Sequence, residues 1–62
     1  MAQKLFNTGD DVLYMAKPGQ PLQKFKVVNS MWDKKTNDFL YIIKNKEGEI
    51  IERISEKLLM MD

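Results

Sequence analysis

The six residues Phe39-Leu40-Tyr41-Ile42-Ile43-Lys44 decide what kind of protein this chain forms. The first five are aromatic or aliphatic, two of them are β-branched, and aromatic and β-branched residues favour strands. Successive side chains along a strand point to opposite faces of a sheet, and here both faces are apolar. A strand with one side facing water needs only one apolar face. The pattern therefore predicts that residues 39–44 form a central strand.

The segment before this strand predicts a hairpin. Residues 33–38 are polar throughout and close a loop. In residues 23–27, Lys24 and Lys26 alternate with apolar residues, which is typical of a half-buried strand. Val28 then breaks the alternation, so we expect a β-bulge or a sharp bend there, as a strongly curved small sheet requires.

The segment after the central strand predicts a second hairpin and a closing element. Residues 45–48 contain a glycine suited to a positive φ, and residues 49–54 read as the fourth strand. Ser55 can cap one short helical turn, with Glu56 placed where the helix dipole favours an acid. Residues 58–61 then form either a short fifth strand or a continuation of that turn.

The beginning of the chain supplies the first strand. Residues 7–10 read as a turn, residues 11–16 as a strand, and residues 17–21, which contain both prolines, as the clearest loop. No repeat, linker or low-complexity tract interrupts the sequence. We therefore expect a single domain over residues 1–62, with residues 1–6 as a candidate loose N-terminal arm.

Two short motifs carry a resemblance to a known fold. The spacing Gly9-Asp10-Asp11-Val12-x-Tyr14 resembles the opening of Tudor, KOW and related small barrels, and Ile54–Leu58 resembles their closing element. The likeness covers about residues 6–61. It implies an all-β fold, a five-stranded SH3-like barrel with one short helical turn before the last strand, and no particular family within that fold.

The composition narrows the function classes. The 62 residues include no Cys and no His, which leaves out disulfides, zinc ribbons and imidazole bases. We therefore expect no enzyme, no cofactor and no metal. The longest apolar run has five residues, far fewer than a membrane helix needs, and the first residues do not resemble a signal peptide. We expect a cytoplasmic protein that does not bind membranes.

Charge is unevenly distributed although the formal net charge is only +1. Residues 1–23 are neutral, residues 24–46 carry +4, and residues 47–62 carry −3. A basic middle is consistent with a surface for phosphates or for an acidic protein. It is equally typical of a solvated face whose lysines protect strand edges and pair with the neighbouring acidic strand.

The aromatic side chains have two alternative uses. Phe25 and Tyr41 are expected in the core. Tyr14, Trp32 and Phe39 are candidates for a cluster at one rim of the sheet, where they could stack on bases or hold a peptide. The alternative is that all of these rings fill a small core.

Two function hypotheses remain. The first is a non-catalytic module that contacts protein, either another copy or a larger complex, because more apolar residues are present than a single core needs. Its candidate contact residues are Leu13, Met15, Ile51, Met60 and Met61. The alternative is sequence-independent nucleic-acid binding by Lys24, Lys26, Trp32, Lys34, Lys35 and Lys44. In style the chain resembles small accessory proteins of bacteriophages or their bacterial hosts.

Overall fold

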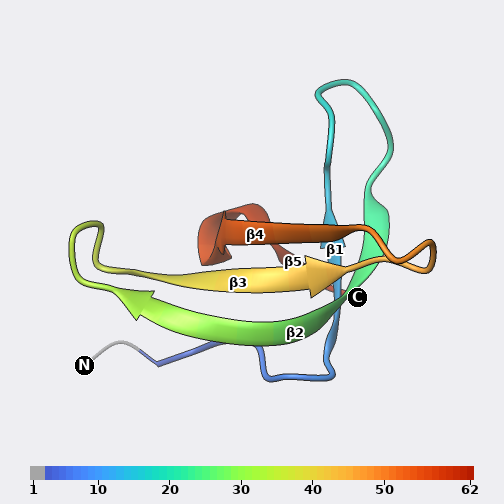
Figure 1. Cartoon of the computed structure of the whole chain (residues 1–62). Coiled ribbons are helices and arrows are strands. Elements are labelled where there is room, and N and C mark those ends of the chain that lie inside the picture. Colours follow the sequence, from blue (N-terminus) through green and yellow to red (C-terminus); the bar gives the residue numbers. More distant parts are fainter. Residues whose placement is uncertain (1–2) are drawn as a thin grey trace.

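The computed structural model describes residues 3–62, which form one antiparallel sheet (Figure 1). The elements in chain order are β1 (Asp11–Tyr14), β2 (Gln23–Asp33), β3 (Asp38–Lys44), β4 (Ile50–Ser55), the 3-10 turn η1 (Glu56–Leu58) and β5 (Met60–Met61). The strand order across the sheet is β4-β3-β2-β1-β5. The prediction of an all-β fold with five strands and a helical turn before the last strand is confirmed. The third strand, predicted to be central, is paired on both sides, but the middle strand of the sheet is β2.

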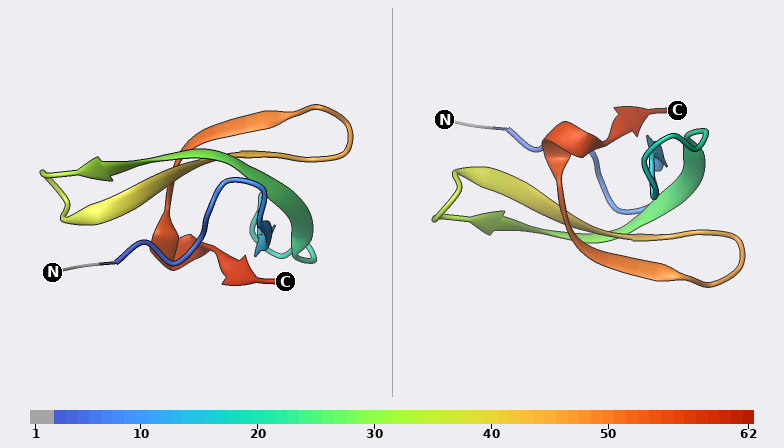
Figure 2. Two further views of the ribbon diagram at one scale, coloured as in Figure 1. Left: turned by 90° about the horizontal axis from the view of Figure 1, so that it is seen from below. Right: turned by 90° about the horizontal axis from the view of Figure 1, so that it is seen from above.

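The sheet is curved but it is not closed. Among residues 3–62 no ladder joins β4 to β5, so these two strands are the edges of the sheet and a closed barrel is not confirmed. The sheet bends so that η1 and β5 lie on its concave side, together with the segment that precedes β1 (Figure 2). We call the concave side the inner face and the convex side the outer face.

Two irregularities in the ladder produce this curvature. In β2 the register with β3 shifts between Val27 and Asn29, which confirms the bulge expected at Val28. In β4, Glu52 and Arg53 lie between two paired residues while β3 supplies one residue, and Arg53 has a φ of 59°. Each extra residue bends its strand and increases the local twist.

The core lies on the inner face. Its buried side chains come from all the long strands and from both ends of the chain: Phe6, Val12, Phe25, Val27, Tyr41, Ile43, Ile54 and Leu59. The expectation that Phe25 and Tyr41 are core residues is confirmed. The rings of Phe6 and Tyr41 meet edge to face at 5.5 Å, a favourable aromatic geometry.

Residues 3–6 belong to the segment expected to be a loose arm, and Leu5 and Phe6 are held against the rest of the protein. Phe6 is 4% exposed, and the backbone N–H of Leu5 donates to Glu56 Oε2 at 2.9 Å. A small sheet of this curvature leaves an opening on its inner face, and the ring of Phe6 fills part of it. Residues 1 and 2 of the expected arm lie outside the described residues.

Local hydrogen bonds fix the turns that the sequence indicated. Asp10 Oδ2 accepts from the backbone N–H of Asn7 at 2.8 Å, and Gly48 has a φ of 88° in the β3–β4 loop. Ser55 Oγ accepts from the backbone N–H of Lys57, as expected of an N-cap. The chain then leaves η1 and forms the short fifth strand, so residues 58–61 do not continue as a helix.

Candidate binding surfaces

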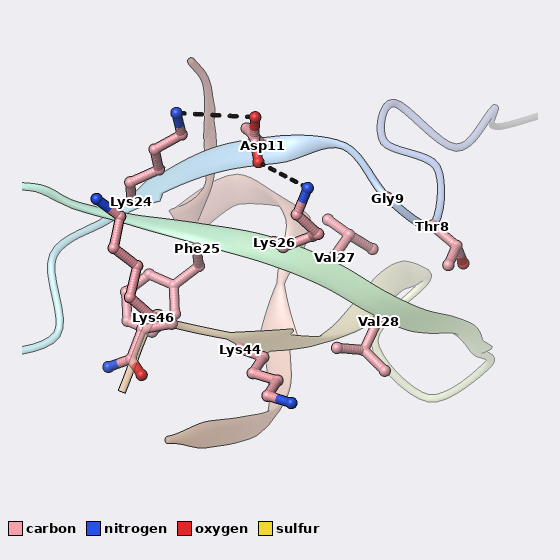
Figure 3. Close-up of a pocket in the computed structure, with 11 residues that line it drawn as sticks. Thr8, Gly9, Asp11, Lys24, Phe25, Lys26, Val27, Val28, Lys44 and Lys46 are labelled. Carbon is pink, nitrogen blue, oxygen red and sulfur yellow. Dashed lines mark ion pairs between the residues drawn. The ribbon is translucent and has the colours of Figure 1, made fainter. Parts of the chain in front are cut away.

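Four lysines line a groove of about 610 Å³ beside the first half of β2 (Figure 3). Lys24 and Lys26 lie on the outer face of β2, Lys44 ends β3, and Lys46 lies in the β3–β4 loop. The turn at Thr8 and Gly9 and the side chain of Val28 complete the walls. We call this the lysine groove.

The lysine groove is only partly neutralised. Asp11 lies 3.8 Å from Lys24 Nζ and 3.5 Å from Lys26 Nζ, and Asp62 lies 3.3 Å from Lys24 Nζ. Within residues 3–62, neither Lys44 nor Lys46 makes an ion pair. In Figure 3 both dashed ion pairs meet at Asp11, and Lys44 and Lys46 extend from the other side of β2. The groove therefore has an excess of positive charge on its β3 side.

The remaining nucleic-acid candidates lie elsewhere. Trp32 pairs with Phe39 across the β2–β3 ladder, with ring centroids 4.9 Å apart, and Lys34 and Lys35 lie in the loop beyond them. Because Phe39 packs against the core, this pair belongs to the inner face, whereas Lys24 and Lys26 belong to the outer face. The six candidates are therefore divided between two sites.

The expected rim cluster of three aromatic residues is not formed. Tyr14 packs edge to face on Phe25, with ring centroids 5.9 Å apart, near the opposite end of β2 from Trp32. Its strand pairs with the first four residues of β2, while Trp32 is the tenth residue of that strand. The length of β2 separates the rings.

The outer face of the sheet carries an apolar patch. Leu40 and Ile42 alternate with the core residues of β3 and so point outward. With neighbours on β2 and β4 they form what we call the outer apolar face: Val28, Met31, Leu40, Ile42 and Ile50. Met31 is 46% exposed and Ile50 58%, whereas Leu40 is only 8% exposed. A hollow of about 230 Å³ lies here, and its lining consists of Met31, Leu40, Tyr41, Ile42, Glu52 and Arg53.

The five protein-contact candidates are not one surface. Ile51 packs against the core, so its assignment to an outward surface is corrected. Leu13 pairs with Met60 across the β1–β5 ladder, and Met61 pairs with Val12 at the same edge. Met15, Met60 and Met61 are all exposed, at the far side of the sheet from β4.

One buried polar network joins the two ends of the chain. The Tyr41 hydroxyl donates to Glu56 Oε2 at 2.5 Å and accepts from the backbone N–H of Phe6 at 3.3 Å. Burial, together with the hydrogen bond to Glu56, raises the pKa of Tyr41 to about 12. The phenol therefore stays protonated at neutral pH, and its two hydrogen bonds join β3 to η1 and to the backbone at Phe6.

Neither a metal site nor a membrane span is found in the described part of the chain. Among residues 3–62, no three His, Cys, Asp or Glu side chains are grouped so that they could hold a metal ion. The same residues contain no helix of the length and apolarity needed to cross a membrane.

Sequence reasoning missed several of the residues that form these surfaces. Lys46 was counted in the basic residues 24–46 but was not chosen as a nucleic-acid candidate. It lies two residues after Lys44, and this spacing could have indicated that the two side chains lie near each other. Met31 and Ile42 were also missed. The signal for Ile42 was the apolar set of β3 that alternates with Tyr41 and Ile43, and Met31 lies opposite Leu40 of that set, on β2.

Comparison of the chain with known protein families, with curated proteins and with solved structures finds no match. The interpretation of its surfaces therefore depends on their own geometry and chemistry.

Proposed function

We propose that this protein is a non-catalytic binding module of SH3-like architecture that contacts a second copy of itself through the outer apolar face. The observation that carries the proposal is that β3 is apolar on both faces, and that on its outer face Ile42 is half-buried beside the exposed side chains of Met31 and Ile50. An apolar patch that a monomer leaves in water marks a contact surface.

The strand order supports the architecture. Four strands follow each other as neighbours in the sheet, and after η1 the fifth returns to pair with the first. This is the connectivity of SH3-like barrels, here with the last closing ladder absent. The short β5 and the bulged β4 both limit pairing at the sheet edges, so contact through a face is favoured over contact through an edge.

The side-chain inventory supports a non-catalytic role. The sequence has no His and no Cys, so its nucleophiles lack an imidazole base. Two carboxylates that sequence reasoning considered have structural tasks: Asp10 accepts a turn N–H, and Glu56 accepts from Tyr41. A cytoplasmic location, as expected from the sequence, is part of the proposal.

The accessible surface area of the chain is larger than expected for a compact monomer, which supports the proposal that a partner covers one face. A compact monomer of this mass is expected to expose about 4,200 Å². This chain exposes 4719 Å². The excess is of the same order as the area that one partner loses in a standard interface, about 800 Å².

Charged residues in the lining of the hollow favour a second copy as the occupant. Glu52 and Arg53 are adjacent at the β4 bulge and both are exposed. In a two-fold interface each patch meets itself in reverse, so Glu52 of one copy would face Arg53 of the other. Such an arrangement pairs opposite charges around an apolar centre.

Light scattering across a concentration series tests this proposal with two variants of equal charge change. Met31→Lys adds a lysine to the outer apolar face, and Met61→Lys adds one at the β5 edge. We expect a mass that rises with concentration in the parent protein, a dimer weakened about tenfold or more in Met31→Lys, and little change in Met61→Lys. A monomeric mass at high concentration, or dissociation by Met61→Lys alone, would contradict the proposed interface.

A further inference from the structure

We propose that the lysine groove binds the phosphate backbone of duplex nucleic acid without reading its sequence. This function is separate from protein contact and uses other residues, apart from Val28 at the boundary of the two surfaces.

Like charges face each other across the β2–β3 ladder. Lys26 and Lys44 are direct partners in the register, which brings their Cβ atoms within about 5 Å. Like charges in this position destabilise a sheet unless an anion lies between them. Asp11 compensates Lys26 from the β1 side at 3.5 Å, but no ion pair among residues 3–62 compensates Lys44. The β3 side of the groove therefore carries positive charge that no ion pair among the described residues compensates.

The lysines are spaced to contact a chain of phosphates. Lys24 and Lys26 are two residues apart on one face of β2, which separates them by about 7 Å along the strand. Lys44 lies one strand across, and Lys46 extends the row into the β3–β4 loop. A lysine is a flexible point charge, suited to phosphates and poorly suited to the paired hydrogen bonds that read a base.

The groove offers nothing for bases to stack on. Its aromatic residue, Phe25, is 2% exposed, and the exposed Trp32 lies at the far end of β2 on the inner face. Tight binding of single strands depends on stacking against aromatic rings. A duplex instead presents its phosphates outward at high density, about one charge for every 1.7 Å of helix axis. The groove chemistry therefore favours the duplex.

The decisive measurement is fluorescence anisotropy of a labelled random-sequence duplex, titrated at several salt concentrations. With Lys44, Lys46 and one of the Asp11-paired lysines engaged, about three phosphates are neutralised, so the slope of log affinity against log salt is about −2.7. Affinity then falls about 40-fold between 50 and 200 mM salt. Absence of binding at 50 mM salt would overturn the proposal.

A matched pair of double variants separates the groove from bulk charge. Lys44→Ala with Lys46→Ala, and Lys34→Ala with Lys35→Ala, each lower the formal net charge from +1 to −1. We expect the first pair to reduce the salt slope by about 2 and the second pair to leave it nearly unchanged. Equal losses in both would mean that net charge alone drives binding, and would overturn the groove assignment.

A gain-of-binding variant keeps the test independent of folding defects. Asp11 is exposed and pairs with Lys24 and Lys26, so Asp11→Asn releases Lys26 and leaves Lys24 paired with Asp62, without removing either lysine. We expect tighter duplex binding and a salt slope steeper by about 1. Weaker binding by a folded Asp11→Asn variant would contradict the proposal.

Two competitors identify the ligand class. A single strand of the same sequence and inorganic polyphosphate are added to the preformed duplex complex. We expect the duplex to be displaced poorly by either at equal phosphate concentration. Stronger binding of the single strand or of polyphosphate would overturn the duplex assignment. The test does not depend on dimer formation, so it can be interpreted even if light scattering shows that the protein is a monomer.

Discussion

The two faces of β3 look alike in the sequence but differ in the structure. On the inner face, Tyr41 and Ile43 are fully buried beneath Phe6 and Leu59. On the outer face, Leu40 is buried at 8% exposure, but Ile42 is only half-buried and its neighbours Met31 and Ile50 are exposed. The difference shows that burial is decided by distant segments that pass over one face, because the strand itself offers apolar residues to both.

The largest expected difference comes from truncating adjacent residues of β3. Ile43→Ala leaves a cavity in the inner core and should lower the free energy of unfolding by about 2–5 kcal/mol. Ile42→Ala removes the same atoms from the partly exposed outer face, and we expect a loss of about 1 kcal/mol or less. Urea unfolding followed by circular dichroism measures both. Similar losses for the two variants would show that the outer face is covered as well as the inner one.

The second test concerns the hydrogen bonds of the Tyr41 hydroxyl on the inner face. The pKa of Tyr41 is raised from 10.0 to about 12, so above pH 10 the unfolded chain releases this proton while the folded protein retains it. The stability contribution is therefore complete below pH 10 and is lost as the pH rises toward 12, by at most about 3 kcal/mol. Urea unfolding at pH values from 8 to about 11 measures this loss.

Tyr41→Phe is the control for this pH effect. It removes the hydroxyl and keeps the ring. The difference between the pH profiles of unfolding free energy for the parent and the variant therefore gives the contribution of the Tyr41 hydroxyl alone. The variant should be less stable at neutral pH by about 1–3 kcal/mol, because the N–H of Phe6 loses its acceptor. Parallel pH profiles for the two proteins would contradict the assignment.

The smallest expected effect is on the outer side, at the start of η1. Ser55 donates to Asp38 and accepts from the backbone N–H of Lys57, so Ser55→Ala should cost about 1 kcal/mol. Ser30→Ala is the matched control, since within residues 3–62 the hydroxyl of Ser30 makes no hydrogen bond, and we expect a change within about 0.5 kcal/mol. Thermal unfolding of both variants checks the ranking.

Much of the fold was predictable because its signals are local. The alternation in β2, its break at Val28, the Gly48 loop and the Ser55 cap each depend on neighbours in the sequence. The position of the first residues was not predictable in the same way. Phe6 is buried by contacts with β3, and nothing within a few residues of Phe6 indicates this.

The candidate surfaces were less predictable because register decides which face a residue occupies. Ile51 and Ile54 are three positions apart, so an uninterrupted strand would place them on opposite faces. The bulge at Glu52 and Arg53 adds one residue and turns both isoleucines inward. The same bulge leaves Ile50 outside. The number of apolar residues therefore indicated that both faces of the sheet carry apolar side chains, but the placement of Ile51 on the outer face was wrong.

The hydrogen bond between Leu5 and Glu56 also bears on how the protein folds. It joins residues 51 positions apart, and Phe6 and Leu59 meet in the core over a similar separation. Contacts between residues so far apart in the sequence slow folding, because the chain loses the entropy of closing a large loop before the contacts form and stabilise it. The hairpins can form early in folding, but the inner face stays open until the segment around Leu59 packs on it. A folding intermediate that contains only the hairpins therefore exposes both faces of β3.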